Sequence, residues 1–173
     1  MSQLKVNSII PVSGVPTGGG GGIIQTVTAV KTDTASTNST SFVDTGLEAT
    51  ITPTSSTSKI LIICCANFSG NDDGLRIASG LFRGSTQIFL GDASSNRRRC
   101  SWQGTTTDDM IESISHVFVD SPATTSATTY KLKFANETTS GSYTMFLNRN
   151  SRDNDQETHG RTASSIILQE VSA

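Results

Sequence analysis

Three consecutive arginines close to the only tryptophan form the densest group of potential binding residues in the chain. Arg97, Arg98 and Arg99 lie shortly before Trp102. Guanidinium groups make paired hydrogen bonds with carboxylates and phosphates, and an indole ring stacks on flat apolar surfaces. The cluster therefore indicates a contact site for a phosphorylated or acidic glycan. The alternative interpretation is a solvated strand edge, where the charges discourage aggregation.

Pairs of acidic residues are a second possible source of chemistry. They occur in three predicted loops, as Asp72 with Asp73, Asp108 with Asp109, and Asp153 with Asp155. A loop with two carboxylates could hold calcium, and two facing carboxylates could hydrolyse a glycosidic bond. None of the pairs fits the DxDxDG calcium loop with its following glutamate. Solvated turn residues are therefore the favoured interpretation, and calcium binding is left open.

The sequence lacks the spacings that catalytic sites require. His116 falls inside a predicted strand and His159 in the polar loop NDQETHGR, so the two imidazoles form no HExxH-type metal pair. No GxSxG elbow, no phosphate-binding GxxxxGK loop and no GxGxxG motif after a strand occurs. We therefore expect no catalytic residue, no cofactor and no bound metal, and a protein that is not an enzyme.

Alternating apolar and polar residues fill most of the chain after residue 22. In the segment YKLKF, Tyr130, Leu132 and Phe134 fall on one face of a strand, with lysines on the other. This is the period of two expected for a half-buried strand. No eleven-residue window carries a convincing helical stripe. Ten strands are predicted, at residues 23–32, 41–52, 59–68, 74–83, 86–91, 98–103, 111–120, 128–135, 142–148 and 164–171.

The spacing of these strands predicts the fold class. Short strands about ten to fifteen residues apart, separated by clusters of turn residues, indicate an all-β antiparallel β-sandwich of the jelly-roll kind. The NETTSG sequence at residues 136–141 predicts a hairpin loop between the strands at 128–135 and 142–148. No parallel α/β sheet is expected.

The strand at residues 59–68 contains the longest apolar run. Residues 59–65 are nearly all apolar, which predicts a central strand that is covered on both faces. Cys64 and Cys65 are adjacent in this run and should point to opposite faces as small apolar side chains. A strained vicinal disulfide or a metal site is the alternative, and three cysteines make no disulfide framework.

The first 22 residues differ in character from the rest. Four large aliphatic residues, Leu4, Val6, Ile9 and Ile10, precede five consecutive glycines at residues 18–22, which resist any fixed structure. A short apolar peptide on such a tether suggests an arm that docks on another protein, for example as an added strand. A frayed terminus is the alternative. The predicted organisation is an arm at 1–22 and a sandwich domain at 23–173.

Composition favours a protein that acts by contact. Serine and threonine make up 50 of the 173 residues, the charged share is 16%, and the net charge of −2 exerts no broad attraction on nucleic acid or anionic membrane. Leucine, isoleucine, valine and phenylalanine contribute only 39 residues, so a subunit interface is one plausible source of further burial. No stretch is long and apolar enough for a signal peptide or a membrane span, which predicts synthesis in a cytoplasm.

Several longer strings carry a resemblance to a known module. They are LKVNSIIPVSGVPTGGGGGIIQTVTAVKTDT, TSFVDTGL followed by ITPTSSTSKIL, LFRGST with GDAS, SPATTSATTYKLKF, and SSIILQEVSA. The chain resembles a module of virion structural proteins of tailed bacteriophages, particularly of cyanophages and other aquatic phages, often described as tail fibre. The likeness extends over residues 4–171 and is weakest at 72–75 and 108–111. The module has no catalytic motif.

The resemblance implies a virion location and a homotrimer of β-rich subunits. The arm, through Leu4, Val6, Ile9 and Ile10, would be the virion anchor, and lysis of the host would release the particle. Four hypotheses compete: a tail-fibre or receptor-binding appendage that contacts host glycan, a capsid decoration protein, a lectin-like domain without a viral role, and an enzyme such as a depolymerase. The enzyme would need paired carboxylates in a groove, which the sequence does not display. Copy number per particle separates the first two, and sugar binding without a particle identifies the third.

Overall fold

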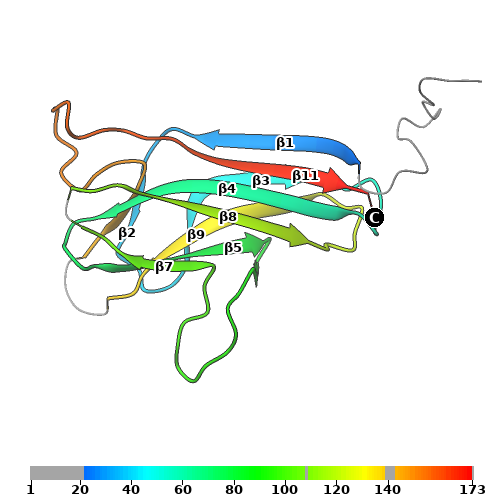
Figure 1. Cartoon of the computed structure of the whole chain (residues 1–173), viewed down its shortest axis with the longest axis horizontal. Coiled ribbons are helices and arrows are strands. Elements are labelled where there is room, and N and C mark those ends of the chain that lie inside the picture. The colour runs from blue at the N-terminus through cyan, green and yellow to red at the C-terminus, as the bar shows by residue number, and fades with distance from the viewer. Residues whose placement is uncertain (1–21, 108, 139–142, 173) are drawn as a thin grey trace, which may run out of the picture.

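The computed structural model describes residues 22–107, 109–138 and 143–172, which form two antiparallel sheets packed face to face (Figure 1). The all-β sandwich predicted from strand spacing is confirmed. The strands are β1 (Ile23–Lys31), β2 (Ala35–Thr37), β3 (Val43–Ile51), β4 (Lys59–Gly70), β5 (Arg76–Arg83), β6 (Thr86–Ile88), β7 (Trp102–Thr105), β8 (Glu112–Asp120), β9 (Thr128–Asn136), β10 (Met145–Leu147) and β11 (Ser164–Val171). In these described residues, no helix is long and apolar enough to cross a membrane. The predicted anchor residues Leu4, Val6, Ile9 and Ile10 lie outside the described residues.

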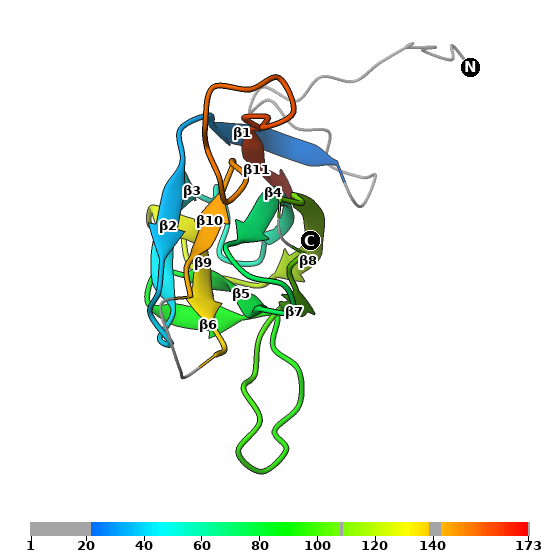
Figure 2. The ribbon, with the colours of Figure 1, turned by 90° about the vertical axis from the view of Figure 1, so that its left-hand side faces the viewer.

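The two sheets have different strand orders. Sheet A runs β1–β11–β4–β8, and the short strands β10 and β2 continue it beside the last residues of β4. Sheet B runs β3–β9–β5, and β6 and β7 share the far edge of β5. Figure 2 views the sandwich along its strands, with β1 and β11 at the top, β4 below them and β8 at the right, and with β9 and β5 of the other sheet below β4.

The core lies between the sheets and follows from the period of two along each strand. On β4, Ile60, Ile62 and Phe68 are fully buried, and Tyr130 and Phe134 of β9 meet them from sheet B. The rings of Phe68 and Phe134 stack with centroids 6.0 Å apart. Alternate residues of each strand share a face, so the apolar half of the pattern forms one continuous interior.

A buried polar group also joins the two sheets. Asp120, at the end of β8, accepts hydrogen bonds from the Tyr130 hydroxyl at 2.7 Å and from Arg83 Nη1 at 2.8 Å. Burial, followed by the hydrogen bond to Asp120, raises the pKa of Tyr130, so its hydroxyl stays a donor. A buried carboxylate is tolerated because both donors satisfy it.

The prediction for the strand with the longest apolar run is half correct. β4 is central in sheet A, between β11 and β8, as predicted. Cys64 is fully buried and Cys65 is exposed, so the two thiols point to opposite faces, and both are free. The prediction that both faces of this strand are covered is wrong for the single chain, because the side chains of Leu61 and Ile63, on the outer face, are only half-buried. Sheet B covers only the inner face.

Two local predictions are wrong, and one short strand was missed. The segment at 136–141 does not join a hairpin, because β9 belongs to sheet B and β10 to sheet A. The strand predicted at 98–103 begins only at Trp102, so the arginines lie in a loop. The short strand β2 was not predicted. It pairs with β10 over three residues, a ladder too short to leave a periodic signal.

Candidate functional site

A loop at residues 89–101 joins β6 to β7 and extends away from the sandwich (Figures 1 and 2). At its start, the Phe89 ring packs against Phe118 with centroids 5.1 Å apart, and the His116 ring lies 6.1 Å away. At its end, the Ser101 amide donates to the Ser79 carbonyl at 3.0 Å. We call this segment the projecting loop. Both of its ends are fixed to the body, which makes it a defined protrusion.

Arg98 contacts the body of the protein. Its guanidinium forms an ion pair with Glu137 and donates to the Thr40 carbonyl, and it lies over the Phe42 ring at 5.1 Å from the centroid. The Arg98 side chain is 26% exposed and the Glu137 side chain 13%. Burial raises the pKa of Glu137, and the nearby Arg98 opposes that rise. Arg98 thus fastens the projecting loop to the start of β3 and the end of β9.

Arg97 and Arg99 remain on the surface of the projecting loop. Arg99 Nε donates to the Gly91 carbonyl at 2.7 Å, which ties the two limbs of the loop together. The Arg97 amide closes a turn by donating to the Ser94 carbonyl at 3.0 Å. Its guanidinium has no hydrogen bond or ion pair within the part of the chain that the structure describes. Of the three consecutive arginines, Arg97 is the one whose guanidinium is most available to a ligand.

Trp102 does not stand beside the exposed arginines. Its indole is half-buried against the core, and it lies over Gly104, where a Cβ atom would come within 2.4 Å of the ring. The structure therefore leaves Arg97 and Arg99 exposed on the projecting loop and places Arg98 and Trp102 in contacts with the body. Receptor contact by these residues stays a prediction.

The described loops that carry Asp72, Asp73, Asp109, Asp153 and Asp155 lie at the end of the sandwich that is opposite the start of β1 and the end of β11 (Figure 1). Asp153 lies between two arginines, with Oδ2 2.8 Å from Arg149 and Oδ1 2.7 Å from Arg161. Asp109 forms an ion pair with Arg152 at 2.8 Å. The loops at 71–75, 105–111 and 148–163 meet here, and we call this end the loop end. Asp108 lies outside the described residues.

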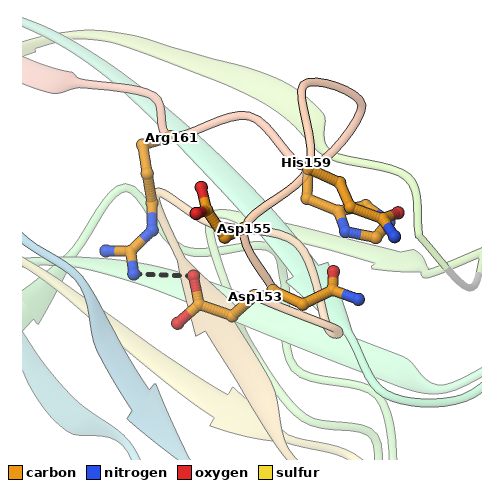
Figure 3. Close-up of a pocket in the computed structure, with 6 residues that line it drawn as sticks. Asp153, Asp155, His159 and Arg161 are labelled. Atoms are coloured by element: carbon orange, nitrogen blue, oxygen red, sulfur yellow. Dashed lines mark ion pairs between the residues drawn. The ribbon is translucent and has the colours of Figure 1, made fainter.

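A shallow hollow of about 300 Å³ opens at the loop end, lined by Asp153, Asn154, Asp155, Gln156, His159 and Arg161 (Figure 3). In the figure, the ion pair of Asp153 with Arg161 forms one side. A cation would have to compete with that guanidinium for the carboxylate, so the geometry favours an ion-paired surface over a calcium loop. Among the described residues, no group of three histidines, cysteines or carboxylates could hold a metal.

A serine–histidine pair was not anticipated from the sequence. The Ser79 hydroxyl lies 3.0 Å from Nε2 of His116, a distance typical of a nucleophile and its base. Ser79 is fully buried and His116 is 2% exposed, so no substrate could reach them. Burial lowers the pKa of His116 from 6.5 to about 4, which keeps the imidazole neutral. The pair therefore links β5 to β8 within the core.

Comparisons with known proteins concern the fold alone. No family model matches the chain, and no curated protein matches it. Similar solved structures include infectious bursal disease virus of the Gx strain, at 14% identity and a TM-score of 0.45, covering 86% of this chain and 36% of that one. T=1 particles derived from the same virus show 9% identity and a TM-score of 0.47, covering 98% of this chain and 44% of that one. The VP2 subviral particle of this virus shows 10% identity and a TM-score of 0.46, covering 98% of this chain and 43% of that one. The chain spans less than half the length of these proteins, and TM-scores below 0.5 carry nothing about function.

Proposed function

We propose that the chain is a virion structural protein that acts by contact, as a tail-fibre or receptor-binding appendage attached through the arm at residues 1–22. The observation that carries the proposal is the separation of the two ends of the sandwich. β1 begins, and the described chain ends, at one end, and the loop end lies at the other (Figure 1). An elongated β-sandwich held at one end leaves both the loop end and the projecting loop, which extends from the lower side of the sandwich in Figure 1, free for contact.

The end at which the arm joins the sandwich is firmly built. Glu170 of β11 is fully buried and accepts hydrogen bonds from Gln25 Nε2 at 2.6 Å and from the Thr54 amide at 2.7 Å. Burial alone would raise the pKa of Glu170, but hydrogen bonds from Gln25, Ser58 and Thr54 outweigh it and lower the pKa. A charged group held this way fixes β1 to its neighbours, which suits a point of attachment.

The host contact is assigned to the projecting loop. Arg97 and Arg99 are its exposed cations, and guanidinium groups recognise carboxylate and phosphate groups through paired hydrogen bonds. An acidic or phosphorylated glycan of the host surface is the ligand class that fits them. The low net charge of the whole chain leaves this local charge as the main source of electrostatic attraction.

Two experiments test the proposal. A chain without residues 1–22 is expected to fold but to be absent from purified particles, and normal incorporation would contradict the anchor. Particles with Arg97→Ala and Arg99→Ala are expected to adsorb to host cells about ten-fold less than wild type. Arg76→Ala, an exposed arginine of β5, is the matched control and should adsorb normally. Undiminished adsorption of the double variant would remove the projecting loop from the proposal.

A capsid decoration protein is the alternative virion role. The number of copies per particle distinguishes it from a tail fibre, because a fibre requires a few copies and a decoration protein requires many over the capsid surface. If the labelled chain were distributed over the capsid, the decoration role would be supported and the appendage role would be contradicted. The homotrimer expected from the sequence resemblance is untested, and it is the alternative to the two-fold dimer proposed below.

A further inference from the structure

The outer face of sheet A carries an apolar patch that no described segment of the chain covers. The patch consists of Leu61 and Ile63 of β4, Val117 and Val119 of β8, and Ile167 of β11. Register places Val117 opposite Ile63 and Ile63 opposite Ile167, and Val119 opposite Leu61. The five side chains therefore form one continuous surface over three strands.

Two of these residues are unusually exposed for large aliphatic side chains. Val117 is 59% exposed and Val119 is 53% exposed, and both lie on β8, the last strand of its edge of sheet A. Contiguous exposed apolar surface of this kind marks an interaction site in a stable protein. An edge strand with valines and no lysine or proline also lacks the usual protection against pairing.

The rest of the outer face is almost free of charge. Among the described outward positions of β1, β11, β4 and β8, the one charged side chain is Lys59, which lies at the rim and donates to Ser121 at 2.7 Å. Three pairs of its polar side chains are hydrogen-bonded across the strands: Cys65 with Ser115, Ser113 with Asn67, and Gln169 with Thr26. Polar groups that already have partners lose little when water is excluded. The face can therefore be covered by a dry protein surface.

The outer face of sheet B could not be that covering surface. Lys131 and Lys133 of β9 point outward there, with Asp44 3.6 Å from Lys131 and 3.3 Å from Lys133, and with Glu48 3.8 Å from Lys131. Burying these ions against an uncharged patch would cost their hydration without new partners. Of the two outer sheet faces, only that of sheet A is chemically matched to the patch.

We propose that the outer face of sheet A packs against the same face of a second copy of this chain. Such a contact is self-complementary and gives a dimer with two-fold symmetry. Two sheets packed in this way lie about 10 Å apart, with their outward side chains interdigitated. The inference concerns the purified chain and does not depend on the proposed virion role.

The size of the face is sufficient for a specific dimer. Four strands spaced about 4.8 Å apart and about eight residues long, at about 3.3 Å per residue, cover roughly 500 Å² as a flat projection. Two copies together bury roughly 1,000 Å², and the relief of the side chains raises the accessible area above this value. That total reaches the lower limit for specific interfaces. The expected dimer is therefore reversible and dissociates on dilution.

Sedimentation equilibrium of the full chain tests the proposal. Wild type is expected at about 36 kDa in the tens of micromolar range, twice the chain mass of 18.2 kDa. Val117→Lys with Val119→Lys places two unpaired charges in the contact and should weaken association about 100-fold, leaving monomer. The matched control, Thr50→Lys with Thr129→Lys, adds the same charge to the outer face of sheet B and should remain dimeric.

Val117→Thr with Val119→Thr guards against a folding defect, because threonine keeps the strand propensity and removes the apolar surface. This variant should show native circular dichroism and association about ten-fold weaker than wild type. Monomeric wild type at 100 µM would overturn the proposal. A dimer that survives both valine variants, or a trimer of about 55 kDa, would overturn it as well.

Discussion

The two outer faces of the sandwich are built from the same kind of strand and differ in what their outward residues are. β9 in sheet B sends Lys131 and Lys133 outward, and β8 in sheet A sends out Val117 and Val119. Both strands alternate with a period of two, so both face a common core in the same way. The comparison teaches that the alternation determines the fold, and the residue types at the outward positions determine which face meets water.

Sheet B also covers the aromatic rings on its outer side. Lys133 lies over the Phe82 ring at 4.9 Å, and Arg98 lies over the Phe42 ring at 5.1 Å. The two rings meet edge to face with centroids 5.6 Å apart. Cations of the same chain thus shield the apolar part of this face. The described residues supply no such cover for the patch on sheet A, which is why we propose that a second copy covers it.

Protonation of His116, in the core between the two faces, should have the largest effect on the free energy of unfolding. Because the pKa of His116 falls from 6.5 to about 4 on folding, the unfolded chain binds a proton in that window and the folded chain does not. The free energy of unfolding should therefore fall by about 3 kcal/mol as pH decreases from 6.5 to 4. Urea denaturation at a series of pH values measures this loss. His116→Asn should remove most of it, and His159→Gln, in the loop end, should leave it in place.

The cationic cover of sheet B should give the next largest effect. Arg98→Ala removes the partner of the partly buried Glu137 carboxylate and uncovers the Phe42 ring, so it should lower the free energy of unfolding by about 2 kcal/mol. Thermal unfolding measures the change, and Arg97→Ala, the neighbouring exposed arginine, should leave stability unchanged. Equal stability of both variants would show that Arg98 does not fasten the projecting loop.

The ion pairs on sheet B should contribute less. Lys131→Ala removes partly exposed contacts to Asp44 and Glu48 at 3.6 and 3.8 Å, and should cost about 0.5 kcal/mol at low salt. The effect should disappear in 1 M sodium chloride, because salt screens exposed charges. A loss that is independent of salt would mean that the lysine stem, and not its charge, stabilises this face.

The smallest effect on folding is expected on the patch itself. Val117→Thr should change the free energy of unfolding of the monomer by less than about 0.5 kcal/mol, because the side chain is already 59% exposed. The same substitution should weaken self-association measurably. A large loss of monomer stability would place Val117 in the core of one chain and erase the difference between the two faces.

Much of the fold was predictable because it depends on local alternation. The segment YKLKF forms β9 with Tyr130, Leu132 and Phe134 inside, as its own pattern requires. The opposite orientations of Cys64 and Cys65 follow from the same rule. The central position of β4 was predictable from its apolar run. The inward residues of the run pack against sheet B, whereas its outward residues lie on a face that no described segment covers.

The remaining features depend on partners that are distant in sequence. Ser79 and His116 are 37 residues apart and meet only because the sheets stack, so no local motif announces the pair. The arginine run appeared to be one cluster, but Arg98 finds Glu137 and Thr40 on other segments and is withdrawn from the surface. The strand expected at 142–148 joins sheet A because its hydrogen-bonding partners lie on β4 and β2. Pairings of this kind are set by tertiary packing, which a sequence window does not contain.

The reactivity of the Cys65 thiol tests the contact between copies most directly. Cys65 is exposed in the single chain and lies two residues after Ile63 on the outer face of sheet A, whereas Cys64 is buried. In a Cys100→Ser background, maleimide labelling measured over a range of protein concentrations reports whether the face is covered. A face-to-face dimer predicts slow labelling at high concentration and fast labelling on dilution or in Val117→Lys with Val119→Lys. Fast labelling of wild type at every concentration would contradict it.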